Sequence, residues 1–95
     1  MNLVLTETAF ADLEDIENYI AQDSPTIARR FILKIFDKMD QLPEYPLSGK
    51  PVPEIGDNDI RELLLNNYRI IYQLKDDTIN ILRIVHGARL LDIDI

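Results

Sequence analysis

The fold is decided by residues 68–75, which read Tyr68-Arg69-Ile70-Ile71-Tyr72-Gln73-Leu74-Lys75. In an extended strand, successive side chains point to opposite faces of the sheet. One face therefore carries Tyr68, Ile70, Tyr72 and Leu74, and the other carries Arg69, Ile71, Gln73 and Lys75. The pattern predicts a strand that packs its tyrosine face under a second layer and leaves Arg69 on an open face.

Two further strands are expected on either side of this one. The pairs Asn66-Asn67 and Asp76-Asp77 are typical of tight turns, so residues 60–65 and 78–85 should pair with the central strand as hairpins. With a two-residue turn at 76–77, Lys75 opposes Thr78 and Arg69 opposes Ile84. His86 then lies on the Arg69 face, whereas Arg83 lies on the helix-facing side, where we expect an acid to pair with it.

The first half of the chain predicts a strand and two helices. Residues 2–5 form a short apolar run that ends at Thr6, a helix N-cap, and an apolar stripe with helical spacing then extends to about Ala21. Ser24-Pro25 starts a second helix, which should end near Leu42. The proline- and glycine-rich residues 43–59 are expected to form a loop. The whole chain, 1–95, is therefore predicted to be one α+β domain, β-α-α-β-β-β, with a helical hairpin on one face of a mostly antiparallel sheet.

Composition narrows the classes of function. The 95 residues include seventeen acids and ten bases, giving a net charge of −7, and contain no cysteine. This charge disfavours sequence-independent nucleic-acid binding and favours a basic or mixed protein partner. We find no metal-ligand spacing, no phosphate loop, no signal peptide and no membrane span, so we expect no cofactor and a cytoplasmic location.

Three ordered stretches resemble the ParE/RelE superfamily of toxins from bacterial toxin–antitoxin systems. The first comprises Asp12-Leu13, Tyr19-Ile20 and Ala28-Arg29-Arg30-Phe31. The second is Pro46-Leu47-Ser48-Gly49-Lys50. The third comprises Ile60-Arg61-Glu62-Leu63, Tyr68-Arg69-Ile70-Ile71-Tyr72 and residues 81–89, which end in His86-Gly87-Ala88-Arg89. Together they span almost the whole chain in the order found in the family.

The resemblance implies one of two activities. RelE-like members cut messenger RNA on the ribosome, and in this chain Arg69, His86 and Arg89 would be their catalytic residues. ParE-like members inhibit DNA gyrase by binding it and are not nucleases. The two basic residues that the nucleases carry on the preceding strand are replaced here by Ile60 and Glu62. We therefore favour gyrase inhibition over ribosome-dependent RNA cleavage, with a non-toxic, antitoxin-binding co-repressor as a third reading.

The resemblance also implies a cognate antitoxin, ParD-like or similar, and contact with DNA only through the antitoxin complex. Ile27 and Phe36 lie beyond the inner line of the second helix and are candidates for antitoxin contact. Arg61, Arg69 and Arg89 are further candidates for partner binding. The last residues, 90–95, alternate apolar and acidic side chains and predict either one more edge strand or a frayed terminus.

Overall fold

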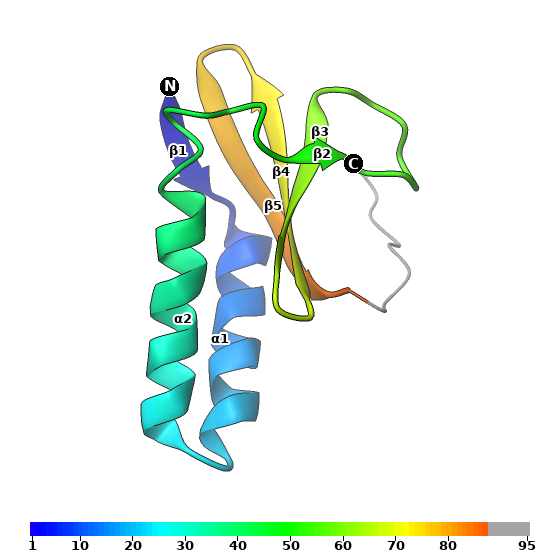
Figure 1. Ribbon diagram of the computed structural model, residues 1–95. Coiled ribbons are helices and arrows are strands. Elements are labelled where there is room, and N and C mark those ends of the chain that lie inside the picture. The colour runs from blue at the N-terminus through cyan, green and yellow to red at the C-terminus, as the bar shows by residue number, and fades with distance from the viewer. Residues whose placement is uncertain (88–95) are drawn as a thin grey trace.

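The computed structural model describes residues 1–87. Seven elements follow one another along the chain (Figure 1): β1 (Asn2–Leu5), α1 (Glu7–Ala21), α2 (Pro25–Met39), β2 (Lys50–Pro51), β3 (Ile60–Leu65), β4 (Tyr68–Lys75) and β5 (Thr78–His86). The predicted α+β class and the order of the six expected elements are confirmed. The two-residue strand β2 lies inside the segment predicted to be a loop, and α2 ends three residues before Leu42.

The strands form one sheet in the order β1-β5-β4-β3-β2. β1 pairs parallel with β5, and every other pair is antiparallel. The helical hairpin of α1 and α2 lies along one face of this sheet, and its turn projects beyond the end of the strands (Figure 1). The predicted hairpin over a mostly antiparallel sheet is therefore correct.

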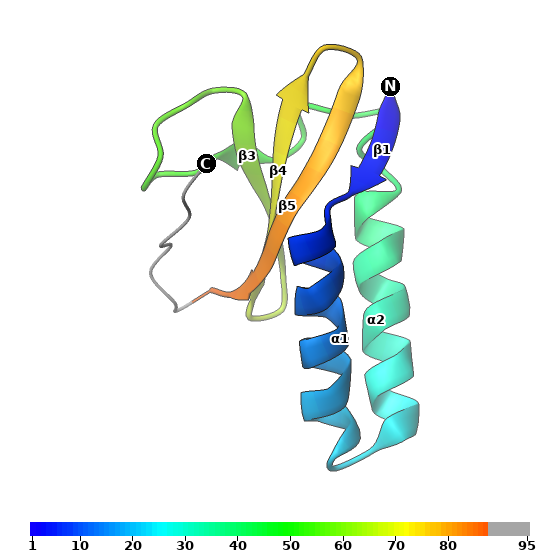
Figure 2. The ribbon, with the colours of Figure 1, turned by 180° about the vertical axis from the view of Figure 1, so that it is seen from behind.

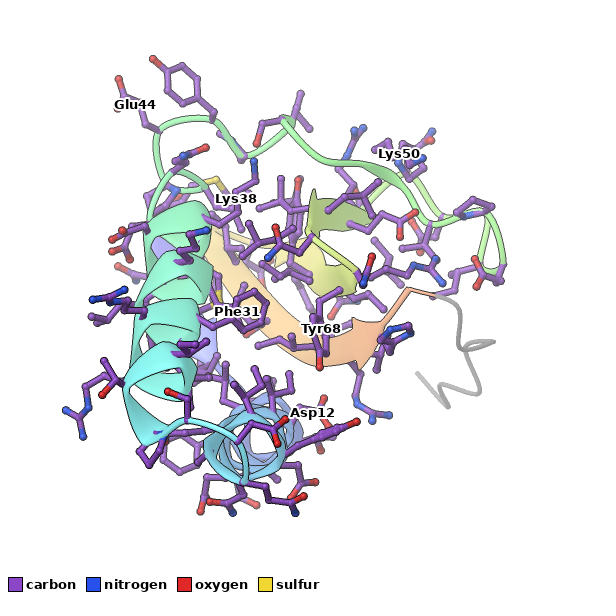
Figure 3. The ribbon with its side chains drawn as sticks, turned by 60° about the horizontal axis from the view of Figure 1, so that its bottom comes forward. Asp12, Phe31, Lys38, Glu44, Lys50 and Tyr68 are labelled. Atoms are coloured by element: carbon purple, nitrogen blue, oxygen red, sulfur yellow. The ribbon has the colours of Figure 1, made fainter. Side chains whose placement is uncertain are left out.

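The main core lies between the helices and the sheet. Ile70 and Tyr72 of β4 are fully buried there, and Tyr68 and Leu74 pack against the same cluster. In Figure 3, Phe31 of α2 and Tyr68 point toward one another, and their ring centroids are 5.4 Å apart. The alternation read from residues 68–75 thus gives the correct inner face of the strand.

The opposite face of the sheet is not open, and this corrects the sequence-based expectation. Residues 40–59, between α2 and β3, pass over it and are called the covering segment below. Val52 and Ile55 from this segment pack on Ile71 and Val85. Figure 2, which views the molecule from behind, shows this long connection arching out beside β3. The alternation of residues in β4 could not predict that this face is buried, because the residues that bury it come from a segment with no regular sequence pattern.

A β-bulge between β4 and β5 changes the predicted register. Lys75 opposes Thr78 as expected, but a shift next to Ile71 places Arg69 opposite Val85 and His86 opposite Tyr68. The predicted pairing of Arg69 with Ile84 is therefore wrong, as is the placement of His86 on the Arg69 face. The bulge arises because Ile81 and Ile84, three residues apart, are both buried in the core under the helices, which a strict period of two does not allow.

Helix α1 is fixed to the sheet where β1 ends. Thr6 caps the helix by accepting a hydrogen bond from the Ala9 N–H at 3.2 Å, and its hydroxyl donates to the Ile81 carbonyl at 2.7 Å. One side chain therefore ends the strand, starts the helix and anchors both to β5. The first turns of α1 are held next to the part of β5 that extends beyond β1.

Tyr72 fastens the covering segment to the sheet from inside the core. Its hydroxyl donates to the Pro46 carbonyl at 2.8 Å and accepts from the Gly49 N–H at 3.0 Å. Burial raises the pKa of Tyr72, while the hydrogen bond from Gly49 acts in the opposite direction. The folded state therefore keeps this phenol neutral at a pH where an unfolded chain has begun to release the proton.

We expect this raised pKa to appear as alkaline instability. A phenol whose pKa is higher in the folded state stabilises the fold fully below its unfolded pKa of about 10, and that contribution is lost as the pH rises through the folded pKa. Urea unfolding of the wild type between neutral and strongly alkaline pH should show the loss. Tyr72→Phe should be less stable at neutral pH and should show a smaller alkaline decline. Parallel pH profiles for the two proteins would contradict the assignment.

Candidate functional site

Arg69 is the best candidate from the sequence, and the structure places it in a buried ionic triad. Its residue exposure is only 7%, and that of Glu62, which faces it from β3, is 4%. Nε donates to Oε2 of Glu62 at 2.5 Å, while Nη1 and Nη2 donate to the two oxygens of Glu54 at 2.7 and 2.9 Å. Glu54 lies in the covering segment, and no pattern in the sequence there predicts that it pairs with Arg69.

The electrostatics of the triad favour a permanently charged guanidinium. Hydrogen bonding to Glu54 raises the pKa of Arg69, burial opposes the rise, and Glu62 adds to it. Two carboxylates share one cation, so the triad carries a net charge of −1 when all three groups are ionised. Three of the five N–H groups of the guanidinium already donate to carboxylates, which leaves it poorly disposed to receive a phosphate.

A surface hollow of about 360 Å³ adjoins the triad. It is lined by Glu62 and Leu64 of β3, Asn66 and Asn67 of the following turn, Tyr68 and Arg69 of β4, and His86 and Gly87 at the end of β5. Two of the lining residues are hydrogen-bonded to each other: the Gly87 N–H donates to the Asn67 carbonyl at 2.5 Å. The hollow thus brings Arg69 and His86 together at one place even though the bulge sets them on different faces of the sheet. His86 also stacks edge-on against Tyr68, with ring centroids 5.6 Å apart.

A second ionic group joins α1 to the exposed edge of β5. Asp12 accepts from Arg83 Nε at 2.8 Å, from Arg83 Nη2 at 3.1 Å and from the Ile84 N–H at 2.9 Å. The hydrogen bond to Asp12 raises the pKa of Arg83, and burial opposes it. The expected acidic partner for Arg83 is confirmed. The bulge places Arg83 opposite Ile71, on the face away from the main core, so its predicted position on the helix-facing side is wrong.

Replacing Asp12 with Asn should lower the free energy of unfolding by about 2 kcal/mol, because the negative charge is lost and an NH2 group replaces one of the two oxygens that accept these hydrogen bonds. Asp15→Asn is the matched control on the same helix, since Asp15 is exposed. It should change stability by no more than about 0.5 kcal/mol. Urea denaturation followed by circular dichroism measures both. Equal effects of the two substitutions would contradict a special role for Asp12.

The remaining candidates are dispersed over the molecule. Arg61 donates from Nη1 to the Gly49 carbonyl at 2.8 Å and from Nε to the Asn58 carbonyl at 2.9 Å, so it braces the covering segment. Ile27 is 57% exposed and lines a groove of about 400 Å³ with Arg30, Phe31, Lys34 and Asn66. Phe36 is 38% exposed but does not line this groove. Arg89 and the tail from Leu90 to Ile95 lie outside the described residues.

Metal and membrane features were searched over the same part of the chain. Residues 1–87 contain no group of three His, Asp or Glu side chains arranged to hold a metal ion. No helix in that range has the length and apolar character needed to cross a bilayer.

Comparisons with known proteins identify the class of this domain. A family described as the ParE toxin of type II toxin–antitoxin system parDE matches residues 3–91. The Toxin RelE2 of Caulobacter vibrioides is 39% identical over 89 residues, which cover 93% of this chain and 97% of that protein. A solved structure of the chromosomal ParDE system from P. aeruginosa superposes with a TM-score of 0.77 at 27% identity, covering 90% of this chain and 95% of that one.

The chain belongs to the ParE toxin family of type II toxin–antitoxin systems, within the ParE/RelE superfamily. The resemblance seen in the sequence is confirmed. An antitoxin is accordingly the expected partner of this protein.

Proposed function

We propose that this toxin acts by binding and inhibiting DNA gyrase in the cytoplasm, and that its cognate antitoxin neutralises it. The observation that carries the proposal is the state of Arg69. A ribonuclease of this superfamily would need the Arg69 guanidinium to stabilise phosphate charge, but three of its five N–H groups already donate to Glu54 and Glu62. A non-nucleolytic toxin makes no such demand on it.

The proton-transfer groups argue in the same direction. Cleavage of RNA through its 2′-hydroxyl needs a base and an acid near the phosphate. His86 lines the hollow, but the second candidate, Glu62, is buried against Arg69 and lies where a polyanion would be repelled. The net charge of −7 opposes docking on ribosomal RNA as well.

The antitoxin surface is proposed to include the groove beside α2. Ile27 and Phe31 supply apolar contact, while Arg30 and Lys34 add positive charge to an otherwise acidic protein. An amphipathic, acidic segment of the antitoxin would match both properties. Ile27→Asp should weaken the complex at least tenfold. Leu33→Asp, at an equally exposed position on the same helix, should have little effect.

Two assays on the purified toxin test the proposed target. Gyrase supercoiling should be blocked in proportion to toxin concentration, with the block relieved by the antitoxin, and translated messages should remain intact on ribosomes. Normal gyrase activity together with cleaved messages would assign the toxin to the ribonuclease class. Expression without growth arrest would instead favour an antitoxin-binding co-repressor.

A further inference from the structure

The last residues of β3 have an open backbone edge. β2 pairs with β3 only at Arg61 and Glu62, so in the described part of the chain no strand lies beside the end of β3 on that side. The Ile60 carbonyl accepts from the Val52 N–H in the direction of β2. Because the direction of the backbone groups alternates along an antiparallel strand, Leu64 points its N–H and C=O the same way, past the end of β2. Within residues 1–87, neither group makes a hydrogen bond.

The outer edge of β2 is protected, in contrast to that of Leu64. Since Val52 donates toward β3, the preceding Pro51 faces outward, and a proline has no N–H to offer a further strand. Lys50 adds a charge to the same short strand. Lysine and proline at a sheet edge are common means of preventing strand addition. Leu64 is 53% exposed and lies just beyond this protection.

Two surface hollows flank the open edge, and Asn66 lines both of them. The groove beside α2, lined also by Ile27 and Phe31, lies on the helix side of the sheet. The hollow of about 360 Å³ includes Leu64, which points to the opposite face because its neighbour Leu63 is buried in the main core. A strand added beside Leu64 would therefore send alternate side chains toward the groove and toward the hollow.

We propose that an extended segment of the antitoxin adds a strand to β3 at Leu64 and places alternate side chains in the groove beside α2. The inference rests on the proposed function in taking that groove as the antitoxin surface. Arg30 and Lys34 line the groove, so the residues that enter it are apolar or acidic, whereas those on the other face are apolar where they meet Leu64. Hydrogen bonds to the Leu64 N–H and C=O fix the register of the segment.

Hydrogen exchange of the toxin in complex with its cognate antitoxin tests the pairing directly. The Leu64 amide should exchange about a hundredfold more slowly in the complex than in the free toxin. An antitoxin helix in the groove would have no free backbone groups to pair with this amide. An unprotected Leu64 amide in a saturated complex would overturn the proposal. So would protection, in its place, of the Leu3 and Leu5 amides, which face outward on β1.

Two substitutions of Leu64 separate backbone pairing from side-chain contact. Leu64→Pro removes the outward N–H without breaking a hydrogen bond to β4, and it should weaken antitoxin binding about tenfold or more. Leu64→Ala keeps the N–H and should weaken binding no more than about threefold. Circular dichroism establishes whether the variants are folded. Equal effects of the two folded variants would overturn the proposal, and if Leu64→Pro does not fold, hydrogen exchange of the wild-type complex decides alone.

Ile27→Asp distinguishes this inference from the proposed function. Weaker binding by Ile27→Asp together with an unprotected Leu64 amide would keep the groove and exclude the added strand. Unchanged binding by Ile27→Asp together with a protected Leu64 amide would refute the groove as the antitoxin surface and keep the added strand. Gyrase takes no part in these measurements, so a toxin with another target gives the same result.

Discussion

Arg69→Met should lower the free energy of unfolding by about 3–5 kcal/mol, because it leaves the buried Glu62 carboxylate without its cation. For a domain of this size the total is roughly 5–14 kcal/mol, so the loss is a large fraction of the stability. Urea denaturation at neutral pH measures it. Loss of toxicity in this variant would therefore report unfolding, not the removal of a catalytic group.

A second substitution and a surface control complete the test of the triad. Adding Glu62→Gln to Arg69→Met removes the stranded charge and should recover much of the lost stability. Arg30→Met removes an exposed arginine from α2 and should change the free energy of unfolding by no more than about 0.5 kcal/mol. If Arg69→Met behaves like Arg30→Met, the triad does not hold the fold together.

Gly49→Ala should destabilise the protein by about 3 kcal/mol through overpacking. A Cβ at this position would lie 2.6 Å from the Glu62 carbonyl oxygen and 2.6 Å from the Tyr72 hydroxyl. Neither neighbour can move freely, because one is strand backbone and the other is a fully buried ring. The covering segment would have to lift from the sheet, which faster hydrogen exchange of the Gly56 and Val52 amides would detect.

The adjacent residue supplies the control for Gly49. Ser48 is exposed, and Ser48→Ala should alter stability by no more than about 0.5 kcal/mol. Tyr72→Phe in the Gly49→Ala background removes one of the two close oxygens and should restore only part of the loss. Full tolerance of Gly49→Ala would mean that the segment is not held as tightly as its contacts indicate.

The regular elements were predictable because each has a local signal. Ser24-Pro25 marks the start of α2, and the alternation of residues 68–75 marks the buried face of β4. The bulge was not predictable from the turn alone, since it depends on Ile81 and Ile84 both reaching the core under the helices. Counting outward from Asp76-Asp77 gives the correct partner for Lys75 and the wrong one for Arg69.

The candidate site was only partly predictable, for a different reason. Arg69 could be selected from its strand, and Glu62 could be paired with it across the sheet. Glu54 could not, because it is fifteen residues from Arg69 in a segment without periodicity. The interpretation of Arg69 depends on that one residue, since Glu54 turns an arginine expected on an open face into a buried, doubly paired one.

The two connections on either side of α2 should tolerate change very differently. The segment from Pro43 to Asp59 looks irregular, but Tyr72, Arg61 and Arg69 each bind it at a separate point. An epitope tag or fluorophore inserted there would have to break at least one of these attachments. The turn between α1 and α2 projects away from the sheet (Figure 1), so it is the better place for a label. Anyone following this toxin in cells should attach the probe at residues 22–23 and leave the longer connection intact.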